Sequence, residues 1–255
     1  MLSTVLILLI AGGSGTGIYF LMMDVQQPSA VTVDLTISTI GDSLTQGGEW
    51  MVTVGYGSYY PDCYQYYVYQ YLHVRGLETQ VKDLGIGGQI ISQICGRFNT
   101  TVPANYIVCM AGTNDVFRAN YSEPEAEVDA NLSAHIIATY NATIFNTIAY
   151  QESLGKAAPV LILCSIPPLA KLNGGNIDLY DAIRSVNAAI KNYVQTLNRT
   201  NILFCDMYAA VSNQSGWMIP SICKSDGVHF NNIGDQVEGE AIAKVICDNY
   251  YHGGP

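Results

Sequence analysis

Short apolar runs alternate along the chain with longer stretches that carry apolar residues at helical spacing. The apolar, β-branched runs predict strands, and they lie at residues 31–40, 80–84, 106–112, 159–166 and 202–208. The helical stretches lie between and after them, at residues 61–75, 88–97, 122–155, 177–197 and 235–251. Strands that alternate with helices predict a parallel sheet that is covered on both faces. We therefore expect one α/β domain, a three-layer α/β/α sandwich around a five-stranded parallel sheet.

Local signals mark the ends of two of these helices. Pro61 suits the first turn of a helix, and Gly76 stands just past the end of the same stretch. Ser122 and Glu125 have the spacing of a capping box, which predicts that Ser122 caps the long helix that follows.

The first 23 residues carry no charged side chain. As a helix, a run of this length would span roughly 30 Å of hydrocarbon, and Gly13 and Gly17 have a spacing that suits close helix packing in lipid. We expect an uncleaved N-terminal anchor (1–23), a polar linker (24–30) and the folded α/β domain (31–255). A cleaved signal peptide stays open as the alternative, although no Lys or Arg precedes the apolar run.

The composition of the chain indicates which classes of molecule it can bind and where it works. The formal net charge is −10, and the 11 Lys and Arg residues are spread thinly. Because proteins that bind nucleic acid need clustered basic residues, nucleic acid is not an expected partner. Six N-x-[ST] sequons favour a glycosylated surface outside the cytoplasm. They are Asn99, Asn120, Asn131, Asn141, Asn198 and Asn213.

Seven cysteines are an odd number, so at least one is unpaired within the chain. Cys109, Cys164 and Cys205 lie inside apolar runs and are expected to be small buried hydrophobes. A disulfide between Cys223 and Cys247 is left open by the sequence. No C-x-x-C spacing occurs, which argues against a zinc or redox motif.

Chemically useful residues follow several of the predicted strands. Ser43 follows the first strand, Gly88 follows the second and Asn114 follows the third, while Asp226 and His229 come just before the last helix. The carboxyl ends of strands in an open α/β sheet lie at one edge, where ligands bind. We therefore expect these residues to meet in space.

Each of these residues has a use in acyl transfer. A serine hydroxyl becomes a good nucleophile when a histidine takes its proton, and a carboxylate holds that histidine in the right tautomer. Asp226 and His229 are three residues apart, so in a helical-type turn their side chains face the same way. The oxyanion needs preorganised donors, for which the N–H groups of Ser43 and Gly88 and the amide of Asn114 are candidates.

Four sequence blocks carry a resemblance to a known family. They are "GDSLT" at 41–45, "LGIGG" at 84–88, "GTND" at 112–115 and "DGVH" at 226–229. In this order they resemble the SGNH (GDSL-type) hydrolases, which are esterases and lipases. The resemblance implies a flavodoxin-like sheet, an acyl-enzyme mechanism, and no metal or other cofactor. Asp83 departs from the family, in which many members carry Asn, and this leaves the hydrogen bonding of the adjacent loop in question.

Other interpretations of these residues are weaker. Asp42 could be a phosphatase nucleophile of the haloacid-dehalogenase type, but such enzymes need a second Asp where this chain has Leu44. The alternative from another class is a membrane-anchored, non-catalytic binding or scaffold subunit that keeps the fold. Among esterases, the blocks do not separate glycan esters from lipid esters, and we favour a short acyl group.

Overall fold

The computed structural model describes residues 33–46, 53–54, 63–171 and 177–252 of the chain. The proposed anchor and linker, residues 1–30, therefore lie outside the described residues. Within the described ranges, no helix is long and apolar enough to cross a membrane.

In the described part of the chain, six strands form one sheet, in the order β2-β3-β1-β4-β5-β6. Five of them are parallel. These are β1 (Leu35–Gly41), β3 (Thr79–Gly85), β4 (Tyr106–Met110), β5 (Val160–Cys164) and β6 (Ile202–Cys205). The first parallel strand lies between the second and third, which is the flavodoxin-like order. The prediction of a five-stranded parallel sheet is confirmed. The sequence did not predict β2 (Thr53–Val54), an antiparallel edge strand that is too short to show a period.

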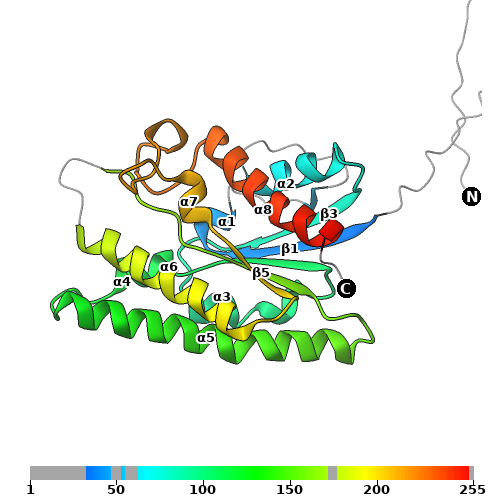
Figure 1. Ribbon diagram of the computed structural model, residues 1–255, viewed down its shortest axis with the longest axis horizontal. Helices are drawn as coiled ribbons and strands as arrows, with labels where there is room; N and C mark the ends of the chain where they lie inside the picture. Colours follow the sequence, from blue (N-terminus) through cyan, green and yellow to red (C-terminus); the bar gives the residue numbers. More distant parts are fainter. Residues whose placement is uncertain (1–32, 47–52, 55–62, 172–176, 253–255) are drawn as a thin grey trace, which may run out of the picture. The chain divides into compact units, whose positions relative to one another are not determined.

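Helices cover both faces of the sheet, as predicted (Figure 1). One face carries α2 (Tyr64–His73), α7 (Met207–Val211) and α8 (Asn232–His252). The other face carries α3 (Ile91–Cys95), α4 (Thr113–Arg118), α5 (Glu125–Ser153) and α6 (Ile177–Leu197). Three short segments complete the described elements: α1 (Ser43–Gln46), η1 (Phe98–Thr101) and η2 (Pro220–Ile222).

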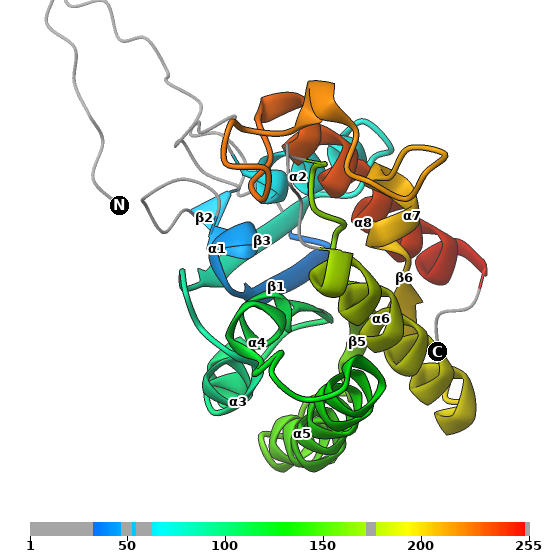
Figure 2. The same ribbon diagram turned by 90° about the vertical axis from the view of Figure 1, so that its left-hand side faces the viewer.

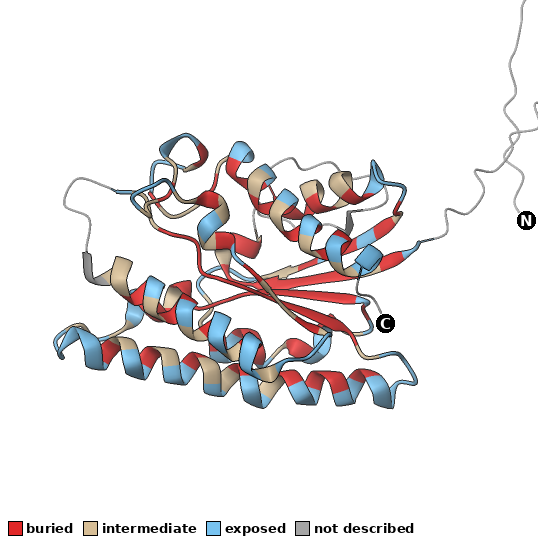
Figure 3. Ribbon diagram, viewed as in Figure 1, coloured by how far each residue is buried: buried red, intermediate tan, exposed pale blue. Residues whose placement is uncertain are grey.

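The sheet is buried between two apolar clusters, one on each face (Figure 3). Side chains of one strand alternate between them: Ile37 packs toward α2 and α8, whereas Ile40 packs toward α3 and α5. Cys109, Cys164 and Cys205 are buried in this core, as expected. Cys223 and Cys247 are both free thiols, so the disulfide left open between them is not formed.

Two local predictions on this scaffold were wrong. Pro124, not Ser122, is the N-cap residue of α5, and it makes no side-chain cap. The Ser122 hydroxyl donates instead to the side chain of Asn120. The helix starts only after Pro124, because a residue that precedes proline is disfavoured in helical conformation. The predicted helix 88–97 is also shorter, since α3 ends at Cys95 and the chain continues into η1.

Candidate active site

The carboxyl ends of β1, β3 and β4 lie at one edge of the sheet, which faces the viewer in Figure 2. α1 and α4 begin at this edge, immediately after β1 and β4 respectively. The residues that the sequence singled out are therefore carried by short segments that follow the strands.

The nucleophile candidate, Ser43, is the first residue of α1. Gly41 ends β1 in a place with no room for a side chain, because a Cβ atom there would collide with Thr45 Oγ1 and the Met110 carbonyl. The next residue, Asp42, is only 1% exposed. Its Oδ1 accepts a hydrogen bond from the Leu44 N–H at 3.0 Å, which fixes the turn. Burial raises the pKa of Asp42 to about 6, and this outweighs the Leu44 hydrogen bond, which lowers it.

The acid–base candidates form one compact turn before α8. Asp226 Oδ1 accepts hydrogen bonds from the backbone N–H groups of Val228 and His229, both at 2.9 Å. Asp226 Oδ2 lies 2.8 Å from His229 Nδ1. Burial raises the pKa of Asp226, but the hydrogen bonds from His229 and Val228 outweigh it, and the net pKa is lowered. A carboxylate therefore faces the inner nitrogen of the imidazole.

The same histidine reaches the serine. His229 Nε2 lies 2.9 Å from Ser43 Oγ, although the two residues are 186 positions apart. The structure thus joins Ser43, His229 and Asp226 in one hydrogen-bonded chain. With a carboxylate on Nδ1, the imidazole carries its proton there and offers Nε2 as an acceptor to the hydroxyl. This is the geometry that activates a serine for attack on a carbonyl.

The glycine loop after β3 lies against this chain. A Cβ atom on Gly87 would lie 3.5 Å from Ser43 Cβ, and the Gly87 N–H donates to Gln46 Oε1 at 2.7 Å. Gly88 has a φ of +75°, which favours glycine. Asp83 Oδ1 accepts the Gly85 N–H at 2.7 Å, so an Asp supports this loop. Burial raises the pKa of Asp83 to about 6.

Asn114, in the first turn of α4, lies against the same loop. Its Nδ2 donates to the Gln89 carbonyl at 3.0 Å, which occupies one of the two amide hydrogens. The neighbouring Asp115 accepts the Ile91 N–H at 2.9 Å. α4 therefore holds the glycine loop in place.

Sequence reasoning missed three residues of this supporting structure: Gln46, Gln89 and Arg118. Arg118 ends α4, and its Nη2 donates to the Gly88 carbonyl at 2.8 Å. Its spacing of four residues from Asn114 would have been a signal, but α4 itself was not predicted. Gln46 and Gln89 carry no distinctive local signal, because their partners lie in other segments.

The other histidines are not part of this arrangement. His73 forms an ion-pair contact with Glu78, at 2.7 Å. His135 lies within α5, and His252 is the last residue of α8. The interpretation of His229 as the base candidate is consistent with these positions.

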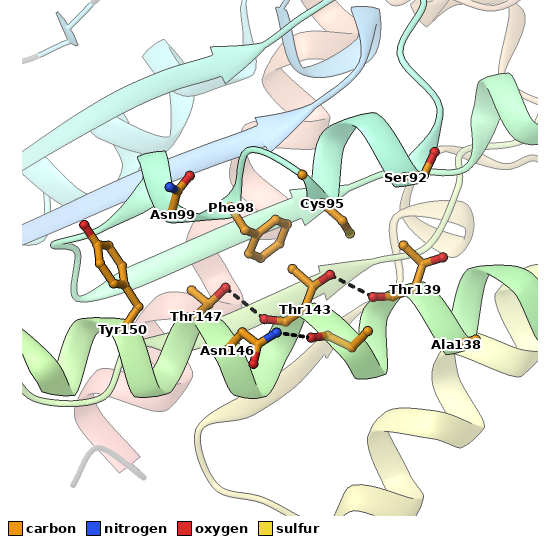
Figure 4. A pocket seen from close by; sticks show the side chains of 12 residues that line it. Ser92, Cys95, Phe98, Asn99, Ala138, Thr139, Thr143, Asn146, Thr147 and Tyr150 are labelled. Atoms are coloured by element: carbon orange, nitrogen blue, oxygen red, sulfur yellow. Dashed lines mark hydrogen bonds between the residues drawn. The ribbon is translucent and has the colours of Figure 1, made fainter.

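The described residues form a small cavity beside Ser43 and a much larger groove on the outer helices. The one bordered by Ser43 and His229 has a volume of only about 10 Å³ within the described residues. A groove of about 710 Å³ lies between α5 and the α3–η1 segment (Figure 4). In that groove the hydroxyls of Thr139, Thr143 and Thr147 donate to carbonyls one turn back in α5, so they present mostly methyl groups. None of the predicted site residues lines it.

Comparison with known families decides the class of the protein. The model of the GDSL-like lipase/acylhydrolase family matches residues 39–237. The chain belongs to this family. It is an SGNH/GDSL-type ester hydrolase, in agreement with the resemblance that the four sequence blocks carry.

Solved structures of esterases share the fold at low sequence identity. An acetylxylan esterase from Geobacillus stearothermophilus is 21% identical, with a TM-score of 0.63 over 83% of this chain and 94% of that one. A carbohydrate acetylesterase from Sinorhizobium meliloti is 16% identical, with a TM-score of 0.58 over 83% and 98%. An aryl esterase from M. smegmatis is 18% identical, with a TM-score of 0.56 over 84% and 98%. A comparison with curated proteins gave no match.

Proposed function

We propose that this GDSL-family hydrolase is a serine esterase that removes a short acyl group, such as acetyl, from a glycan or a lipid. The single observation that carries the proposal is the hydrogen-bonded chain from Ser43 Oγ through His229 to Asp226. The carbohydrate acetylesterase and acetylxylan esterase among the similar structures are consistent with a sugar acetate.

In the proposed mechanism, Ser43 Oγ attacks the ester carbonyl while His229 Nε2 takes the hydroxyl proton. The negative charge on the carbonyl oxygen is stabilised by the N–H groups of Ser43 and Gly88 and by the second amide hydrogen of Asn114. His229 then gives its proton to the alcohol oxygen, and the C–O bond of the ester breaks. Water, deprotonated by His229, then attacks the acyl-enzyme; the bond between the acyl carbon and Ser43 Oγ breaks, His229 returns the proton to Ser43 Oγ, and the acid is released. Asp226 keeps the imidazole oriented throughout.

Two features support the oxyanion role of these donors. Ser43 N–H is at the start of a helix, where backbone donors have no partner within the helix. No partner for the Gly88 N–H is found among the residues that the structure describes. The alternative, a non-catalytic scaffold, has no use for a serine that is hydrogen-bonded to an oriented histidine.

Labelling with a fluorophosphonate probe, followed by a chain-length series of p-nitrophenyl esters from acetate to palmitate, tests the proposal. We expect the probe to modify Ser43, and turnover to fall as the acyl chain lengthens. Ser43→Ala should abolish labelling and hydrolysis, whereas Ser92→Ala, an exposed serine on α3, should keep both. An unlabelled wild-type protein would support the scaffold alternative.

We further propose that the enzyme works outside the cytoplasm and is anchored by residues 1–23. The uncharged apolar composition of this segment supports the proposal, as does the exposure of all six sequon asparagines. A chain that starts at Gln26 should stay soluble and hydrolyse a small soluble ester as well as the full chain. Aggregation of that shortened chain would contradict the anchor, and a mature terminus near Gly13 to Gly17 would indicate a cleaved signal peptide.

A further inference from the structure

The glycine loop beside Ser43 carries an exposed cation. The Arg118 guanidinium donates from Nη2 to the Gly88 carbonyl at 2.8 Å. The same nitrogen would lie 3.9 Å from a Cβ atom built on Gly88. The positive charge therefore lies directly against a residue proposed for the oxyanion hole.

A second cation lies on the histidine side of Ser43. Lys224 lines the small cavity that Ser43 and His229 border. Its backbone N–H donates to the His229 carbonyl at 2.7 Å, so its position is tied to the catalytic turn. Lys224 is exposed, as is Arg118. The glycine-loop side of Ser43 thus carries a guanidinium bonded to Gly88, and the cavity on its histidine side is bordered by an exposed lysine.

Neither charge is neutralised by an ion pair within the described part of the chain. Asp115 accepts the Ile91 N–H and interacts with the Arg118 charge without forming an ion pair with it, and Asp226 faces His229. Arg97, at the start of η1, offers a contrast: three of its nitrogens donate to the Gln89 side chain and the Leu84 carbonyl, on either side of the glycine loop. Arg118 uses one of its five donors in the bond to Gly88, which leaves most of the fork available.

The net charge of the chain bears on what Arg118 and Lys224 can attract. The chain has a formal net charge of −10, so its general field repels anions. Unpaired cations at a site locally reverse that field and can raise the rate of association with an anion by about 10-fold or more. The guanidinium fork matches carboxylate and phosphate groups.

We infer that the enzyme prefers esters whose alcohol part carries a carboxylate or a phosphate, and that Arg118 and Lys224 recognise this negative group. The inference rests on the proposed function, in which His229 gives a proton to the alcohol oxygen. That step places the alcohol part close to the side of the site that Lys224 borders.

A matched pair of aryl acetates tests the preference: 4-acetoxybenzoate, which is an anion, and 4-acetoxybenzamide, which is neutral. The measurement is the ratio of kcat/KM for the anion to kcat/KM for the neutral ester. We expect the wild-type enzyme to favour the anion. Arg118→Gln and Lys224→Gln should each lower the ratio by about 5-fold to 10-fold, and added salt should shrink the preference. Lys156→Gln removes an exposed charge outside the site and should leave the ratio unchanged.

Arg118→Lys separates recognition from support of the loop. It keeps the charge, so the ratio should stay closer to wild type than in Arg118→Gln. If Arg118→Gln slows both esters equally, Arg118 only holds the glycine loop and the inference is wrong. A wild-type enzyme that hydrolyses both acetates without preference would overturn the inference alone, whereas failure to hydrolyse either would overturn the proposed function.

Two further substrates distinguish the source of the negative group. O-acetylated glucuronate represents an acidic sugar, and acetylated glycerol 3-phosphate represents a phospholipid headgroup. Each is compared with its uncharged counterpart, acetylated glucose or acetylated glycerol. The pair with the larger ratio identifies the source, and ratios near one for both pairs would contradict the inference.

Discussion

Ser43 and His229 come from two regions that are held in different ways. Ser43 follows a buried strand, in a segment where Asp42 and Thr45 are at most 1% exposed. Asp226 and His229 lie in a turn where their side chains are 48% and 36% exposed. The first region is positioned by packing against other strands and helices. The second is positioned mainly by hydrogen bonds within four residues.

The contrast indicates how the two regions should respond to substitution. A change in the buried segment should affect folding as well as catalysis, because close-packed neighbours cannot move aside. A change in the exposed turn should affect catalysis with little effect on folding. The predictions below test this difference, beginning with the largest expected effect.

His229→Ala should lower kcat/KM for p-nitrophenyl acetate by about 10⁴-fold or more, since Ser43 loses the group that takes its proton. The free energy of unfolding should change by less than about 1 kcal/mol, because the side chain is partly exposed. Steady-state kinetics and urea unfolding measure the two quantities. His135→Ala, an exposed histidine of α5, is the control and should change neither. Substantial turnover by His229→Ala would exclude His229 as the base.

Asn114→Ala should lower kcat by about 10²-fold to 10³-fold, the usual cost of one oxyanion donor. The substitution also removes the hydrogen bond to the Gln89 carbonyl, so a modest loss of stability should accompany it. Asn146→Ala, on the exposed surface of α5, is the matched control. If KM rises and kcat is unchanged, the Asn114 amide contacts the substrate in the ground state instead.

Gly41→Ala should destabilise the fold by about 3 kcal/mol, because the added methyl group collides with Thr45 and the Met110 carbonyl. Gly227 is a buried residue of the turn that carries His229 and has a φ of +77°, so backbone strain in Gly227→Ala should cost about 1–2 kcal/mol. Urea unfolding of the two variants compares the regions directly. Equal losses in the two variants would contradict the contrast between packing and local hydrogen bonding.

Asp42→Asn should change how stability depends on pH. Because burial raises the folded-state pKa of Asp42 from 3.8 to about 6, wild-type stability should fall as pH rises from about 4 to 6. Asn keeps the acceptor for the Leu44 N–H and removes the charge. The variant should be more stable than wild type at pH 8, by up to about 3 kcal/mol, and nearly equal to it at pH 4.

Urea unfolding at both pH values measures this effect, and Asp248→Asn, an exposed carboxylate of α8, is the control. The free energy of unfolding of Asp42→Asn is compared with that of wild type at each pH. If the difference is the same at pH 4 and pH 8, burial of the Asp42 charge is not its cause. The exposed Asp226 provides the opposite case, since hydrogen bonds lower its pKa.

Much of this architecture was predictable from local patterns. The helix predicted over 177–197 is observed with these bounds as α6, because its apolar residues recur at helical spacing over many turns. The alternation of strands and helices along the sequence predicted the three layers and the parallel sheet. Ser43, Gly88, Asn114, Asp226 and His229 were proposed as site residues from their type and spacing, because each follows a strand or precedes a helix in a short block of sequence.

Other features depend on segments that meet only in the folded chain. The edge strand β2 and the short helix α4 contain too few residues to show a period of their own. The contact of Arg118 with Gly88 joins segments 30 residues apart, and the contact of His229 with Ser43 joins segments 186 apart. The sequence determined which chemical groups are present and which elements carry them. Only the tertiary structure decided their distances, burial and raised or lowered pKa values, because these depend on neighbours that come from distant parts of the chain.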